Sequence, residues 1–157
     1  PPTAPARGVQ ACALLAFGSG NWRGPQAEGG HLMALFLKAL GGRVEELHGD
    51  GVRIRFIGDR SACAEDLQAG MADAEALTAD NPRMTVVIAV NYGGQWDIAQ
   101  AARELATQVE QGAMRADQIT SEALGQHVAL ADLPLPDLLT RTGGEQRLSN
   151  FPLRQLA

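Results

Sequence analysis

Residues 140–150, TRTGGEQRLSN, bring together side chains that could hold a phosphate group. Arg141 and Arg147 stand on either side of a Gly-Gly pair, and Ser149 follows closely. A guanidinium is a planar fork of donors that matches phosphate oxygens, and a serine hydroxyl adds a further bond. This spacing favours a phosphate or diphosphate clamp. The alternative is that one arginine pairs with Glu145 and the other is solvated.

Two other stretches, AFGSGNWRGP (16–25) and NYGGQWD (91–97), are also rich in glycine and polar residues. Glycine lets the backbone approach a ligand closely. Three common signatures do not fit, however. Arg23 occupies the last glycine position of the dinucleotide-binding motif, no G-K-S/T follows as in a P-loop, and FGSGN is not the hydrolase motif that would make Ser19 a nucleophile.

Composition limits the classes of function that the chain can have. The net charge is −5 and the basic residues are scattered, which argues against a duplex nucleic-acid binder and predicts no nucleic-acid partner. No apolar run is long enough to span a membrane and no signal peptide is recognisable.

Cys12 and Cys63 are the only cysteines, and the histidines lie at no spacing typical of a zinc site. We expect two reduced, inert thiols and a cytoplasmic protein.

Alternating strand and helix patterns indicate how these stretches are positioned. Strands are expected at 9–17, 52–58, 84–91 and 137–141, and helices at 26–48, 62–80, 95–111 and 120–129. This order predicts a single α/β domain over 1–157, with a mainly parallel open sheet flanked by helices. The carboxyl ends of parallel strands share one edge, so we expect the glycines, arginines and polar residues to converge there.

Three elements carry more specific expectations. The near-continuous apolar run 9–17 is typical of a strand that is covered on both faces. The segment 31–40 is apolar almost all round, so its helix is buried or lines an apolar cavity. We expect Gly41-Gly42 to interrupt that helix, because each glycine costs about 1 kcal/mol relative to alanine.

We expect the chain to be part of a longer protein. Residues 1–7 are rich in Pro and Ala and form a flexible lead-in, while SNFPLRQLA stops where a helix should begin. Residues 143–157 should be ordered only through contact with a second subunit or with further segments, with Gly143-Gly144 as a hinge.

Five stretches together are far more specific than any one of them. AFGSGNWRGP, VRIRFIGD, EALTADN, VVIAVNYGGQWDI and DLLTRTGGEQRLSNF occur in this order. They closely resemble the bacterial cis-prenyltransferases, and the resemblance covers residues 8–157 essentially without gaps.

The resemblance implies a prenyltransferase that condenses isopentenyl diphosphate onto an allylic diphosphate such as farnesyl diphosphate. With Mg²⁺ it would make a polyprenyl diphosphate such as undecaprenyl diphosphate. The resemblance also implies a homodimer in the cytoplasm, peripheral at the inner membrane through transient contact with its lipid product.

The resemblance also assigns roles to individual residues. The isopentenyl diphosphate would be bound by Arg141, Arg147, Leu148 and Ser149. Asn21 would be the catalytic residue that assists proton removal. Gly18, Ser19, Gly20, Trp22 and Arg23 would contact the substrates. The walls of the product tunnel would be Ala16, Leu32, Leu35, Phe36 and Ile88.

The chain departs from the family pattern in ways that bear on activity. The family's D-G-N-G-R-W stretch, which supplies a metal-binding aspartate, has no counterpart here, nor has its C-terminal glutamate ligand, so no metal ligand is assigned. Gly18, Gly20 and Gly24 replace a usual Ser, Glu and Arg. We therefore expect the 157-residue chain alone to be inactive. The rival hypothesis is a non-catalytic scaffold that binds a diphosphate or a protein partner.

Overall fold

A computed structural model describes residues 7–18, 41–141 and 150–151. The chain forms two compact units, Pro1–Tyr92 and Gly93–Ala157. The predicted lead-in 1–7 lies outside the described residues apart from Arg7.

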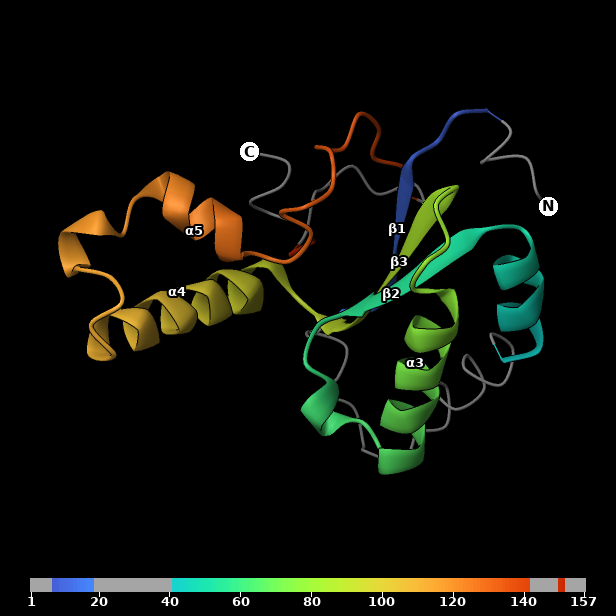
Figure 1. The fold of residues 1–157 in the computed structure, drawn as a ribbon, viewed down its shortest axis with the longest axis horizontal. Coiled ribbons are helices and arrows are strands. Elements are labelled where there is room, and N and C mark those ends of the chain that lie inside the picture. The colour runs from blue at the N-terminus through green and yellow to red at the C-terminus, as the bar shows by residue number, and fades with distance from the viewer. Residues whose placement is uncertain (1–6, 19–40, 142–149, 152–157) are drawn as a thin grey trace. The chain divides into compact units, whose positions relative to one another are not determined.

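A three-stranded parallel sheet is the centre of the first unit (Figure 1). Its strands are β1 (Ala11–Gly18), β2 (Val52–Ile57) and β3 (Met84–Tyr92), in the order β1-β3-β2. Both neighbouring pairs are parallel, so all three carboxyl ends lie at one edge. This confirms the predicted α/β class.

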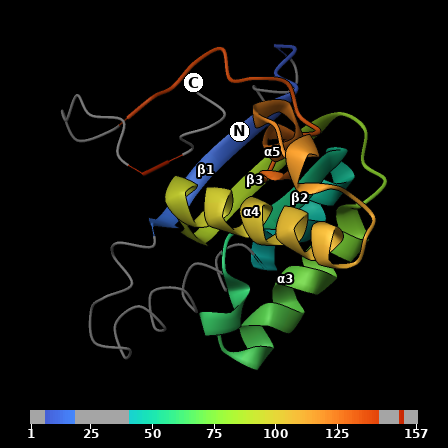
Figure 2. The same cartoon turned by 90° about the vertical axis from the view of Figure 1, so that its left-hand side faces the viewer.

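Two helical segments cover one face of the sheet (Figure 1 and Figure 2). They are residues 41–49 and α3 (Glu65–Thr78). The buried core beneath them draws Ile54, Phe56, Ile88 and Val90 from the strands and Met71 and Ala74 from α3, with Val44 and Leu47 packed against it. Because β3 is the middle strand, Val87 and Ile88, which point to opposite faces, are both almost fully buried.

Gly41 and Gly42, the pair predicted to interrupt a helix, follow residues 31–40, which lie outside the described residues. Gly41 and Gly42 are both helical, and the helical residues run on to 49, followed by a turn in which Gly51 has φ +72°. Val44 and Leu47 pack on the core in the next turn, and this burial offsets the low helix propensity of glycine.

β1 is also less covered than its apolar sequence predicts. Leu14 and Leu15, which point to opposite faces, are 49% and 45% exposed. The reason is the strand order: β1 is an edge strand, paired only with β3 among the described residues.

The other edge of the sheet, along β2, is covered by side chains. Thr78 Oγ1 accepts a hydrogen bond from the Ile54 N–H at 2.9 Å, and Glu75 Oε1 accepts one from the Phe56 N–H at 2.6 Å. Arg60 donates to the Phe56 carbonyl at 2.6 Å and to both Glu75 oxygens, at 2.8 and 2.7 Å. These bonds satisfy backbone groups that an edge strand would otherwise present to other chains.

The second unit contains α4 (Gly94–Glu110), the 3-10 turn η3 (Ala116–Gln118) and α5 (Ser121–His127). α4 ends just before Gly112, which has φ +72°, as expected. His127 joins the two helices, because its Nε2 lies 3.0 Å from the Gln108 amide nitrogen while its Nδ1 lies 2.9 Å from the Ala123 carbonyl. A carbonyl only accepts, so Nδ1 carries the proton and Nε2 accepts from Gln108.

The predicted strand at 137–141 is wrong. These residues form no β-ladder, and the apolar side chains around them are exposed: Leu135 by 72%, Leu138 by 82% and Leu139 by 44%. A strand needs a neighbouring strand to accept its backbone bonds, and no partner is paired with it in the described part of the chain. None of the described helices is both long and apolar enough to cross a membrane.

Candidate functional site

The carboxyl ends of β2 and β3 are tied together at the sheet edge. Asn91 Nδ2 donates to the Asp59 carbonyl at 3.2 Å, and the Asp59 N–H donates to the Asn91 carbonyl at 3.4 Å. Asn91 is 9% exposed and has φ +48°. The predicted convergence of the GD and NYGG stretches at one edge is therefore confirmed.

Gly58 makes this close approach possible. It has φ +109°, and a Cβ atom there would lie 2.0 Å from the Val90 carbonyl oxygen and 3.1 Å from the Tyr92 Cβ. Only glycine fits at this position.

The end of β1 reaches the same edge. Gly18 is in register with Tyr92, one residue beyond Asn91, and Ala16 lies in the same strand. The polar stretch that follows β1 therefore starts from this edge. Its predicted substrate residues Ser19, Gly20, Asn21, Trp22 and Arg23 lie outside the described residues.

A short turn, η2 (Arg60–Ala62), follows Asp59 and leads to Cys63, so that the charges of Asp59 and Arg60 lie near the Cys63 thiol. Asp59 caps it by accepting from the Ser61 N–H at 3.0 Å and from its hydroxyl at 2.5 Å. Burial raises the pKa of the nearby Cys63 thiol, and the Asp59 carboxylate raises it further, while Arg60 opposes them. Cys63 therefore stays a neutral thiol, which agrees with the inert thiol that the sequence predicts.

In the second unit, Asn150 holds the first turn of α4. Its carbonyl accepts from the Gly94 N–H at 2.9 Å and its side-chain Oδ1 accepts from the Gln95 N–H at 2.9 Å. The helix begins after Gly93, which has no side chain to cap these donors. The chain directly after the predicted clamp is thus attached to the start of this helix.

The same turn of α4 holds a second segment of the chain. Asp97 is 4% exposed, and its Oδ1 accepts from the Ala129 N–H at 2.9 Å. A carboxylate in the first turn is also favoured by the positive end of the helix dipole. Asp97 therefore fixes the chain that leads from α5 toward 140–150.

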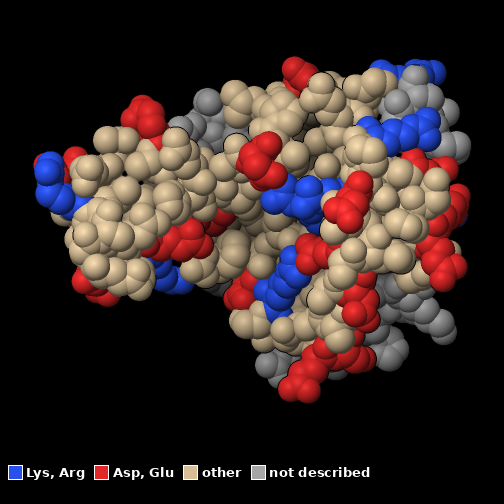
Figure 3. Space-filling view, in the orientation of Figure 1, with Lys and Arg blue, Asp and Glu red and all other residues tan. Residues whose placement is uncertain are grey.

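Of the predicted clamp, only Arg141 is described, and it is exposed and has an interaction of its own. Arg147, Leu148 and Ser149 lie outside the described residues, as does the Gly143-Gly144 hinge. Figure 3 shows that, among the described residues on the face drawn, basic side chains are interspersed with acidic ones.

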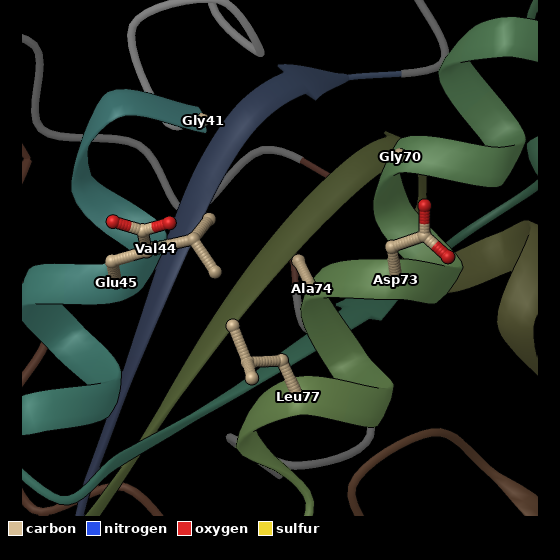
Figure 4. Close-up of a pocket in the computed structure, with 7 residues that line it drawn as sticks. All are labelled: Gly41, Val44, Glu45, Gly70, Asp73, Ala74 and Leu77. Carbon is tan, nitrogen blue, oxygen red and sulfur yellow. The ribbon is translucent and has the colours of Figure 1, made fainter.

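A groove of about 230 Å³ runs between residues 41–49 and α3 in the first unit. Figure 4 shows Val44, Ala74 and Leu77 in the gap between the two helices. Glu45 and Asp73 also line it. Ile88, predicted to wall a product tunnel, is 1% exposed in the core against which Val44 packs. The other predicted wall residues, Leu32, Leu35 and Phe36, lie outside the described residues.

The described residues do not form a metal site. No group of three or more His, Cys, Asp or Glu among them is arranged to hold a metal ion. They therefore do not fit Mg²⁺ on their own, and the predicted cofactor stays a prediction.

Comparison with known proteins decides the family. The model of a family described as "Putative undecaprenyl diphosphate synthase" matches residues 3–157. The chain belongs to the undecaprenyl diphosphate synthase family.

Named relatives are similar over almost the whole chain. The (2E,6E)-farnesyl-diphosphate-specific ditrans,polycis-undecaprenyl-diphosphate synthase of Vibrio cholerae is 51% identical over 150 residues, which are 96% of this chain and 60% of the relative. The synthase of the same name from Xanthomonas campestris is 54% identical over 151 residues, 96% of this chain and 58% of the relative. The chain thus spans about 60% of the length of the curated relatives that it matches.

Two solved structures of prenyl diphosphate synthases are similar to this chain in fold. Lavandulyl diphosphate synthase from Lavandula x intermedia, in complex with dimethylallyl diphosphate, has a TM-score of 0.89 at 38% identity, covering 97% of this chain and 66% of that one. A probable undecaprenyl diphosphate synthase from Campylobacter jejuni has a TM-score of 0.82 at 29% identity, covering 97% of this chain and 69% of that one.

The sequence patterns did not indicate the structural bonds that two asparagines make in this member of the undecaprenyl diphosphate synthase family. Asn91 and Asn150 lie within NYGG and RLSN, stretches singled out by sequence, yet neither was assigned a role. The available signal was position: Asn91 ends a strand that precedes two glycines, and Asn150 directly follows the predicted ligand Ser149.

Proposed function

We propose that the protein containing this chain is a cis-prenyltransferase that extends farnesyl diphosphate with isopentenyl diphosphate to make undecaprenyl diphosphate. The supporting observation is the 51% identity, over 96% of this chain, to a synthase named for that product and for farnesyl diphosphate. The solved relative that holds dimethylallyl diphosphate supports an allylic diphosphate as one substrate.

The chemistry requires a leaving diphosphate, a new carbon–carbon bond and the loss of a proton. The bond from the allylic carbon to the diphosphate oxygen breaks, and the double bond of isopentenyl diphosphate attacks that carbon. A proton then leaves the new product, with help from Asn21. Arg141, Arg147 and Ser149 hold the isopentenyl diphosphate, because guanidinium and hydroxyl donors match its oxygens.

Gly18, Ser19, Gly20, Trp22, Arg23 and Leu148 contact the substrates in this proposal. Mg²⁺ would neutralise charge on the departing diphosphate. Its ligands have no counterpart among the described residues, and none of the steps above involves it.

The growing chain would follow the apolar side of the first unit. The groove between residues 41–49 and α3 supports this route, because Val44, Ala74 and Leu77 give it an apolar lining. Ala16, Leu32, Leu35, Phe36 and Ile88 complete the proposed walls. We also propose a homodimer that works in the cytoplasm and meets the inner membrane through its lipid product.

The clamp is tested by Arg147→Ala. Loss of a charge-assisted bond should weaken isopentenyl diphosphate binding by about 1.5–3 kcal/mol in calorimetry. Arg103→Ala is the matched control, because Arg103 lies in α4, where its guanidinium donates to the exposed Gln100 side chain at 3.1 Å and its carbonyl accepts from the Thr107 hydroxyl at 3.0 Å. Equal affinities for wild type and Arg147→Ala, with both folded, would contradict the assignment.

Activity separates the enzyme from the rival scaffold. The protein containing this chain should incorporate labelled isopentenyl diphosphate into farnesyl diphosphate, and Arg147→Ala should reduce the rate. Diphosphate binding without any elongation would favour the scaffold instead.

A further inference from the structure

Asn91 has hydrogen-bonding capacity that the fold does not use. It is 9% exposed, and its Nδ2 donates to the Asp59 carbonyl at 3.2 Å. Because a carbonyl only accepts, the amide nitrogen must face Asp59, which fixes the orientation of the amide. One N–H and the oxygen Oδ1 are left, and neither has a partner among residues 7–18, 41–141 and 150–151. Buried polar atoms without partners are uncommon and costly, so these two call for an explanation.

Asn81 shows the same side chain in a structural role. Its Nδ2 donates to the Val52 carbonyl at 2.8 Å and to the His48 carbonyl at 3.4 Å. It lies between α3 and β3, at the end of the sheet opposite to Asn91. Asn81 thus uses its amide nitrogen for two backbone bonds, whereas Asn91 uses it for one.

The backbone also distinguishes Asn91 from its neighbours. The β1–β3 ladder pairs Val90 with Phe17 and Tyr92 with Gly18, so that Asn91 is passed over. Its φ is +48°, in the left-handed region. Irregularities of this kind are frequent beside binding sites, where they change the direction of a side chain. This one lies at the edge where the parallel strands end.

We infer that Asn91 binds the diphosphate group of the allylic substrate through its unused N–H, which rests on the function proposed above. The proposed tunnel wall Ile88 lies three residues before Asn91 in β3. The wall residue Ala16 lies two residues before the end of β1 at Gly18. A prenyl chain between these walls places its diphosphate at the strand ends, about 10 Å beyond Ile88.

The chemistry of the amide fits this head group. An N–H donor forms a charge-assisted bond with an anionic phosphate oxygen, which is stronger than a bond to a neutral acceptor. The isopentenyl diphosphate is already assigned to other residues in the proposed function. The allylic diphosphate is therefore the anion that remains for Asn91.

The experiment measures binding of farnesyl diphosphate to the 157-residue chain by calorimetry. Asn91→Gly removes the amide and suits the positive φ, and it should weaken binding about tenfold. Asn91→Asp should weaken binding further, because a carboxylate repels the diphosphate. Asn81→Asp is the matched control: it loses backbone bonds and gains the same charge, yet affinity should stay unchanged.

Farnesol, which has the prenyl chain without the diphosphate, separates a contact from a change in shape. The Asn91 variants should bind farnesol as the wild type does, because the lost N–H acts on the head group alone. Equal losses for farnesol and farnesyl diphosphate would overturn the inference. Equal losses of farnesyl diphosphate binding in Asn91→Asp and Asn81→Asp would overturn it as well.

The outcomes also separate this inference from the proposed function. A wild-type chain that does not bind farnesyl diphosphate would overturn both. Wild-type binding with the same affinity in Asn91→Gly would overturn the contact from Asn91 and leave the proposed function in place.

Discussion

At the scale of single residues, Gly58 and Asn91 form the junction where β2 and β3 end. Asn91 bonds to both backbone groups of Asp59, and Gly58 brings that turn against Val90. Both residues have positive φ, which glycine adopts freely and asparagine tolerates better than most residues. The edge from which the proposed substrate loop leaves β1 therefore depends on these two residues.

Gly58→Ala should be strongly destabilising. Its Cβ would lie 2.0 Å from a backbone oxygen, so strand ends would have to shift, and we expect a loss of about 2–4 kcal/mol in chemical denaturation. Gly70→Ala is the control, because Gly70 is helical with open space around it and alanine there should stabilise by about 0.5–1 kcal/mol. Similar small effects in both variants would contradict the close packing at Gly58.

At the scale of elements, α3 acts as a cover for the open edge of β2. Thr78 and Glu75, one turn apart on α3, take the N–H groups of Ile54 and Phe56. Arg60 then holds Glu75 through two bonds and lies 5.8 Å from the centre of the Phe56 ring. The helix thereby fixes the strand as well as covering its apolar face.

Glu75→Ala should lower the stability that α3 gives to the β2 edge. It leaves the Phe56 N–H and the Arg60 guanidinium without their main partner, so stability should fall by about 1–3 kcal/mol. Glu46→Ala is the control, because the Arg43–Glu46 pair spans 3.8 Å at an exposed surface. The prediction fails if both variants unfold at the same denaturant concentration.

At the scale of the whole chain, the two edges of the sheet differ sharply. The β2 edge is covered, whereas β1 leaves Leu14 and Leu15 about half exposed and has no ladder partner on its outer side among the described residues. Exposed edges of this kind pair readily with other strands.

We expect the 157-residue chain to self-associate through β1. Sedimentation should show an association that grows with concentration, and Leu14→Lys should weaken it by placing a charge on the exposed edge. Ile119→Lys is the control, because Ile119 is 42% exposed in the second unit. A chain that stays monomeric at all concentrations would contradict self-association through the β1 edge.

Much of the fold follows from local pattern. The structure contains the elements that 52–58, 84–91 and 95–111 predict. The alternation of 52–58 and the 3.6-residue period of 95–111 record which face of each element is buried. The apolar run 84–91 records a strand that is buried on both faces. The meeting of Asp59 with Asn91 was also predictable, since parallel strands end at one edge.

Strand pairing, burial and helix packing depend on residues that are distant in the sequence, so a local pattern does not predict them. Residues 137–141 have strand-like composition but no ladder, and β1 has a buried strand's composition at an edge, because pairing and burial belong to a strand's neighbours. Gly41 and Gly42 stay helical because the following turn packs on the core. The bond from Asn150 to the start of α4 likewise depends on the path of the chain between them. Sequence by itself determined the family and its candidate ligands, while folding determined which strand ends meet and which side chains cover the β2 edge.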